Sequence, residues 1–80
     1  MNINDLLGEV VSEVKDFFEN DFYHGVKELT ICNEDRTSLL YVCKTLNKSQ
    51  FGSYIAECSV EAEIVGSKKM YKLKIGFDKL

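Results

Sequence analysis

The chain has 80 residues, with 45% hydrophobic and 29% charged side chains and a formal net charge of −3. This length allows one small domain, and the composition is that of a globular protein, which excludes a disordered chain. The charge is uneven, because residues 1–24 hold six acids and one lysine whereas residues 65–80 hold five lysines and one aspartate. An acidic start and a negative total argue against direct binding to nucleic acid.

Residues 4–23 carry the strongest periodic pattern of the chain. Apolar residues recur there at three- and four-residue steps, which is typical of a helix with one buried stripe. The stripe consists of Ile3, Leu6, Leu7, Val10, Val11, Val14, Phe17, Phe18 and Phe22. Asn2 or Asn4 can cap the start of this helix, and Gly25 can close its end. Because acids interrupt the apolar stretch, it predicts neither a signal peptide nor a membrane span.

Two segments near the end of the chain alternate with the period of a strand. Apolar side chains occupy every second position of residues 54–65 and again of residues 69–77. A tight turn at Gly66 and Ser67 would join them as a hairpin. The resulting register places Val60 opposite Leu73 on an inner face. On the outer face it places Glu61 opposite Lys72.

The middle of the chain predicts a second hairpin. Residues 27–32 and 39–46 are apolar and rich in strand-forming side chains, and a polar run over residues 33–37 separates them as a turn. Residues 46–53 are expected to form a loop, with a short helical turn as the alternative. The predicted fold is α+β: an N-terminal amphipathic helix packs on one face of a four-stranded, mainly antiparallel sheet, in the order α-β-β-β-β.

Catalysis and cofactor binding find little support in the sequence. Its one histidine, His24, follows the predicted helix, and no nucleophile, phosphate-loop or zinc motif occurs. The cysteines Cys32, Cys43 and Cys58 match no metal or redox spacing, so we expect them to be buried, reduced thiols in strands. Free thiols favour a cytoplasmic location. We therefore predict a protein that is not an enzyme and needs neither a cofactor nor a metal ion.

An acidic row along the predicted helix is the most suggestive binding feature. Its members follow at three- and four-residue steps, so they lie on the side of the helix away from the core, about 5–6 Å apart along the axis. They are Asp5, Glu9, Glu13 and Asp16, continued by Glu19 or Asn20. One interpretation is a solvated face that aids solubility. The other is a row of fixed charges that imitates a nucleic-acid backbone and docks in a basic groove.

Phe51 is the second candidate contact. It lies in the polar stretch between Gln50 and Gly52. A large aromatic side chain in such a loop can anchor an interface, but it can equally close one end of the core. Both interpretations stay open at this point.

The opening residues MNINDL, Met1 to Leu6, continue into an acidic amphipathic helix. This start resembles that of small phage-encoded anti-CRISPR proteins, which inhibit the RNA-guided nuclease of type II systems. The resemblance implies a small non-enzymatic inhibitor in the cytosol of an infected bacterium that acts as an acidic imitation of DNA. It covers six residues, and the two C-terminal strands depart from the helical ending of such an inhibitor. No binding residue is carried over by it.

Two functions follow as hypotheses. The first is an inhibitor or interaction protein of phage or mobile-element type that blocks a nucleic-acid-handling host protein, with a CRISPR effector nuclease as the named partner. The alternative is an immunity protein, antitoxin or accessory subunit that binds through its open sheet face or an edge strand. In both cases the expected partner is a protein. Apolar residues expected on the outer sheet face leave monomer and homodimer open; they are Ile55, Val65 and Met70.

Overall fold

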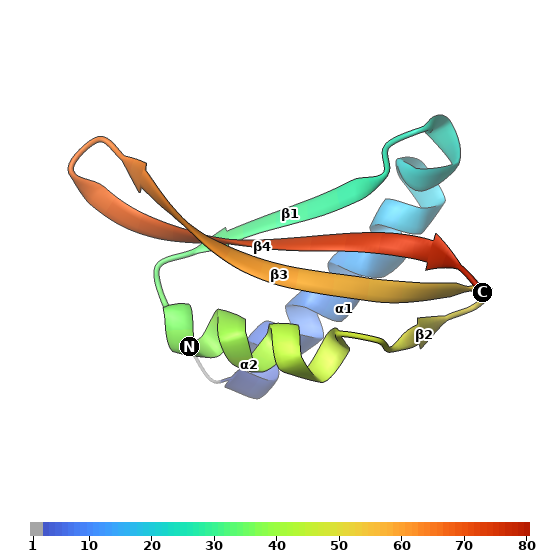
Figure 1. Ribbon diagram of the computed structural model, residues 1–80, viewed down its shortest axis with the longest axis horizontal. Helices are drawn as coiled ribbons and strands as arrows, with labels where there is room; N and C mark the ends of the chain where they lie inside the picture. The colour runs from blue at the N-terminus through green and yellow to red at the C-terminus, as the bar shows by residue number, and fades with distance from the viewer. Residues whose placement is uncertain (1–2) are drawn as a thin grey trace.

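The computed structural model describes residues 3–80. In chain order its elements are α1 (Ile3–Asn20), a short 3-10 helix η1 (Phe22–His24), β1 (Glu28–Asn33), α2 (Arg36–Leu46), β2 (Gln50–Phe51), β3 (Tyr54–Val65) and β4 (Lys68–Lys79). The strands form one antiparallel sheet in the order β1-β4-β3-β2, and both helices lie on the same side of it (Figure 1). The predicted α+β class, with an N-terminal helix on a four-stranded antiparallel sheet, is confirmed.

The first helix follows its apolar stripe. Leu6, Val10, Val14 and Phe17 are buried, each three or four residues from the next. After Asn20 the chain tightens into η1, and Gly25 then closes it in the left-handed conformation with φ of 98°. The predicted cap Asn4 lies inside α1, while Asn2, the other predicted cap, lies outside the described residues.

The C-terminal hairpin has the predicted register. Val60 pairs with Leu73 and Glu61 with Lys72, and Gly66 takes the turn with φ of 65°. Its ion pairs run diagonally rather than straight across the strands. Glu61 contacts Lys74 and Glu63 contacts Lys72, each with 3.1 Å between carboxylate oxygen and ammonium nitrogen. Diagonal neighbours on one sheet face are within reach of such long side chains.

The prediction of a strand over residues 39–46 is wrong, because this segment belongs to the helix α2. Asp35 caps the helix: its carboxylate accepts hydrogen bonds from the Ser38 amide at 3.1 Å and the Ser38 hydroxyl at 2.7 Å. These bonds hold the pKa of Asp35 below its ordinary value. From Ser38 onward the buried positions follow helical spacing, with Leu39, Val42 and Leu46 inside. The polar run over residues 33–37 is therefore largely a helix start, not a hairpin turn.

The second helix also changes the strand pairing. Because residues 39–46 are helical, the segment that follows β1 cannot pair with it as a strand. β1 pairs with β4 instead. The expected loop over residues 46–53 contains the last residue of α2 and the two-residue strand β2, which pairs with the start of β3. The predicted order α-β-β-β-β and the predicted middle hairpin are thus wrong.

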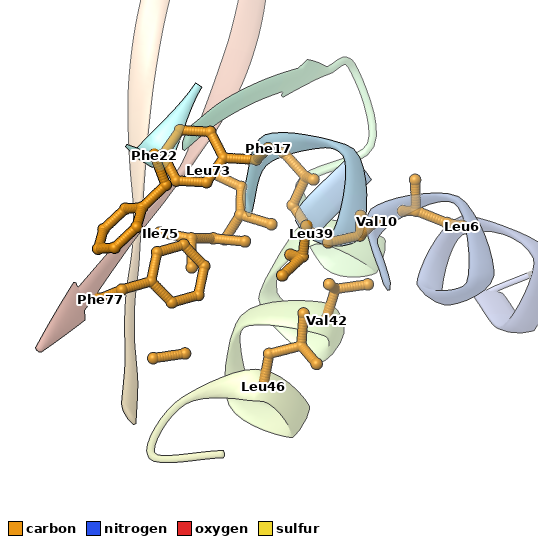
Figure 2. Close-up of a cluster of buried hydrophobic side chains, with 12 residues drawn as sticks. Leu6, Val10, Phe17, Phe22, Leu39, Val42, Leu46, Leu73, Ile75 and Phe77 are labelled. Atoms are coloured by element: carbon orange, nitrogen blue, oxygen red, sulfur yellow. The ribbon is translucent and has the colours of Figure 1, made fainter. Parts of the chain in front are cut away.

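The core lies between the two helices and the inner face of the sheet (Figure 2). From β4 it takes Leu73, Ile75 and Phe77, which meet the buried stripes of α1 and α2. The rings of Phe17 and Phe77 stack with 5.7 Å between their centroids. One side of α1 therefore packs in the core, and its other side faces solvent.

Candidate binding surface on the first helix

All predicted members of the acidic row are exposed on α1. We use this name for the five carboxylates Asp5, Glu9, Glu13, Asp16 and Glu19, which are all exposed and lie outside the buried stripe of the helix. The same spacing that buries four apolar side chains therefore gathers five acids on the outside. Lys15 is the single base within α1.

The acidic row has no ion pair with any other residue in the described range 3–80. The four ion pairs of that range all lie elsewhere: Lys48–Glu57, Lys68–Glu34, Lys72–Glu63 and Lys74–Glu61. Each of them involves a carboxylate on β3 or in the loop after β1. Three of these four lysines lie on β4, and the carboxylates of α1 face solvent.

The position of these five carboxylates along α1 does not stabilise the helix. Only Asp5 stands in the first turn, where negative charge stabilises a helix, while Glu19 stands in the last turn, which holds no basic residue. Acids near that end cost about 0.3–1 kcal/mol each at low ionic strength. Asp5 and Glu9, like Glu9 and Glu13, are four residues apart and repel each other. A need for helix stability does not explain this row.

Phe51 lies beside the end of the acidic row, although it is not in a loop as predicted. It belongs to β2, is half-buried, and meets the Phe77 ring edge-on with 6.0 Å between centroids. Its position at the edge of the core agrees with the interpretation that it closes one end of the core. It also lines an open hollow of about 470 Å³ between α1 and the β2–β3 turn. The other lining residues are Lys15, Phe18, Glu19, Gly52, Ser53 and Tyr54.

The aromatic wall of this hollow was not predicted. Phe18 was assigned to the helix stripe and Tyr54 to the hairpin, and neither assignment indicates that the two side chains meet. Their rings lie 5.7 Å apart. The turn at Gly52, with φ of 60°, folds Tyr54 back beside Phe51 and so completes the wall. A two-residue link with glycine first is a hairpin signal that could have revealed this contact.

The histidine and the cysteines are the side chains that the sequence offers for chemistry. His24 is exposed at the end of η1 and does not line the hollow beside Phe51. All three cysteines are free thiols, but Cys32 is exposed and Cys43 lies on a helix, so their predicted burial in strands holds in neither case. Burial, with a smaller effect of nearby Cys43, raises the pKa of the Cys58 thiol to about 11. No group of three metal-binding side chains occurs within residues 3–80.

Comparison with protein-family models, with curated proteins and with solved structures found no match for this chain. Within residues 3–80 no helix combines the length and apolarity needed to cross a membrane. The case for function therefore depends on the surface of the protein itself.

Proposed function

We propose that this protein acts by binding, without catalysis, and that the acidic row of α1 docks in a basic groove of a partner protein. The observation that carries the proposal is the set of five exposed carboxylates without an ion pair in residues 3–80. A fixed line of like charges on a rigid helix attracts a groove of opposite charge and raises the rate of association. Phe51 and the hollow beside Glu19 add a packed contact at one end of the row.

The partner class that best fits such a line of charge is a protein with a nucleic-acid channel. Successive carboxylates stand about 5–6 Å apart along the helix axis, so the row presents regularly spaced negative charge as a nucleic-acid strand does. Together with the resemblance of the first six residues, this supports an inhibitor of phage or mobile-element type that works in the host cytosol. We name the RNA-guided nuclease of a type II CRISPR system as its partner.

The direct test is DNA cleavage by the guide-loaded nuclease with increasing amounts of the protein. The proposal predicts inhibition that is overcome by excess target DNA, because both compete for one channel. The variant with Glu9→Lys, Glu13→Lys and Asp16→Lys should lose inhibition while keeping its thermal transition. A matched control with Lys68→Glu and Lys69→Glu changes charge on β4 instead and should inhibit normally. Equal inhibition by the triple variant would refute the acidic-row mechanism.

The second candidate function is an immunity protein, antitoxin or accessory subunit that binds through the sheet. The observation that favours it is that no helix of residues 3–80 covers the outer sheet face (Figure 1). Val65 and Met70 border an apolar hollow on that face. Binding of this kind would weaken on Val65→Asp or Met70→Asp and depend little on salt. The charge variants of α1 would leave it unchanged, which separates the two functions.

A further inference from the structure

The strand β3 has one long edge that only part of the protein covers. β4 pairs with its whole length, whereas β2 pairs only with Tyr54 and Ile55. The link from α2 to β2 covers the next positions. There the Lys48 amide donates to the Ala56 carbonyl at 2.7 Å, and the Cys58 amide donates to the Asn47 side-chain oxygen at 3.0 Å. Beyond Cys58 this edge meets no further partner within residues 3–80.

The direction of the bonds at Ala56 identifies which backbone groups are open. Its amide and carbonyl both point away from β4, and this direction recurs at every second residue of a strand. The amide and carbonyl groups of Val60, Ala62 and Ile64 therefore point away from β4, toward the uncovered edge of β3. The pairing with β4 runs without a bulge, and the open stretch has no proline or lysine, so it lacks three of the devices that protect an edge from added strands.

The helix side of this edge is apolar. Leu40 and Cys43 are three residues apart and share one flank of α2. The end of α2 lies at the β3 edge, because the Asn47 amide donates to the Cys43 carbonyl at 2.9 Å and the Asn47 side-chain oxygen accepts from the Cys58 amide. Leu40 is 38% exposed, and Ile64, on the same sheet face as Val60, is 75% exposed. A strand added beside β3 would cover apolar surface on this side.

The outer side of the same edge is acidic. Glu61 and Glu63 point to the outer sheet face, each bonded to a lysine of β4 and each still about half exposed. Side chains of an added strand would stand directly beside them. In a second copy, the antiparallel pairing of Val60 with Ile64 would place Glu61 opposite Glu63 of the second copy. Like charges directly opposite destabilise a sheet, so self-pairing is disfavoured.

We propose that the β3 edge from Ser59 to Val65 accepts, as an added strand, an extended segment of a partner protein in which lysine or arginine alternates with apolar residues. The apolar side chains cover Val60, Ala62 and the flank of α2, and the cations lie beside Glu61 and Glu63. Backbone hydrogen bonds supply affinity, and the alternation supplies specificity. This surface is separate from the acidic row, so either proposal can fail alone.

The test uses the full chain and a synthetic peptide of about nine residues, a usual strand length, in which lysine alternates with valine. Amide hydrogen exchange by NMR reads out the site. The open amides of Val60, Ala62 and Ile64 should exchange fast in the free protein and become protected with the peptide. The amides of Glu61 and Glu63, bonded to β4, should change little.

Two control peptides separate alternation from charge. A peptide with the same lysines and valines in two blocks has equal charge but cannot match the edge, and a peptide with glutamate in place of lysine opposes Glu61 and Glu63. Both should bind at least about tenfold more weakly. Equal binding of the block peptide, or shifts confined to α1, would show attraction to the acidic row and would overturn the proposal. Protection of the same amides in concentrated free protein would point to a second copy and would also overturn it.

A protein variant tests the backbone contact. Ala62→Pro removes one outward amide without breaking a bond to β4, and proline is tolerated at such an edge position. Ala62→Thr keeps the amide and is the matched control. We expect Ala62→Pro to weaken peptide binding at least about tenfold and Ala62→Thr to leave it near the original value. If both variants keep their NMR dispersion and bind alike, added-strand pairing is refuted.

Discussion

The carboxylates on the outer face of α1 and those on the outer face of the β3–β4 hairpin differ in whether they form ion pairs. On the hairpin, Glu61 and Glu63 each lie 3.1 Å from a lysine of the next strand. On α1, five exposed carboxylates have no such partner within residues 3–80. The protein has ten basic residues, so cations are not scarce; they stand elsewhere. The contrast teaches that the two acidic surfaces differ in pairing: within residues 3–80 the hairpin acids are balanced by neighbouring lysines, and the helix acids are not.

This difference has an energetic side. A cross-strand pair of opposite charge stabilises a sheet by about 0.2–1 kcal/mol. Like charges four residues apart on a helix oppose folding by about 0.2–0.5 kcal/mol per pair. The hairpin charges thus contribute to the fold, whereas the helix charges work against it. Because proteins often lose stability at the places that serve function, the outer face of α1 is a candidate binding surface.

The largest expected effect is the difference in stability between substitutions on the buried and the exposed side of α1. Val14 is fully buried, and its neighbour Glu13 is exposed. Val14→Asp places a carboxylate in the core without a partner, which should cost more than the roughly 5 kcal/mol that holds a domain of this size together. Glu13→Ala should change stability by less than about 0.5 kcal/mol. Circular dichroism during urea denaturation measures both, and a cooperative transition in Val14→Asp would contradict the packing described.

A charge reversal tests the hairpin side of the comparison. Glu61→Lys should lower the free energy of unfolding by about 1 kcal/mol, because it replaces an attraction to Lys74 with repulsion. Adding Lys74→Glu should restore most of that loss. The double-mutant cycle gives the coupling directly from urea denaturation. Glu9→Lys on α1 is the control, since it breaks no ion pair, and a loss as large as that of Glu61→Lys would erase the contrast.

Neutralising acids on α1 should raise the free energy of unfolding, whereas the charge reversal on the hairpin lowers it. Glu9→Gln combined with Glu13→Gln removes the repulsion of two pairs along the row, so the protein should gain about 0.4–1 kcal/mol at low salt. At high salt the gain should vanish, because screening already weakens that repulsion. Thermal melts of both proteins at two salt concentrations measure the effect. Loss of stability at low salt would mean that these acids have stabilising partners.

The smallest effect appears at alkaline pH. The hydrogen bond to Glu63 raises the pKa of Lys72 above its ordinary value of 10.5. A raised pKa in the folded state stabilises the protein below the ordinary value, and this contribution is lost as pH rises through the folded value. The stability difference between wild type and Glu63→Gln should therefore be constant from about pH 7 to 9.5 and shrink above 10.5. A difference that persists unchanged at higher pH would argue against this ion pair.

The sequence predicts the two regions of this comparison better than the segment between them. The stripe of α1 and the alternation of β3 and β4 are long, so their periods identify both elements and even the pairing of Glu61 with Lys72. Residues 39–46 are short and rich in strand-forming side chains, which hides their helical spacing. The spacing of Asp35 and Ser38, a helix start, was the available signal. That β1 pairs with β4 depends on tertiary packing and has no local signal.

The candidate site was predictable only in part. Helical spacing alone gathers Asp5, Glu9, Glu13 and Asp16 on one exposed side, as the structure has them. The absence of ion pairs along the row within residues 3–80 depends on where the lysines of the sheet point. The hollow beside Phe51 depends on a turn that folds Tyr54 toward α1. Both features arise from contacts between distant segments, which periodicity does not encode.

The most direct test of docking through the acidic row is the salt dependence of binding to the guide-loaded type II nuclease. We expect the affinity to fall steeply as salt rises. We also expect the combined variant Glu9→Gln, Glu13→Gln and Asp16→Asn to bind more weakly with a much shallower slope. A variant with the same affinity and the same slope, or a wild-type protein that does not bind, would contradict docking through the acidic row.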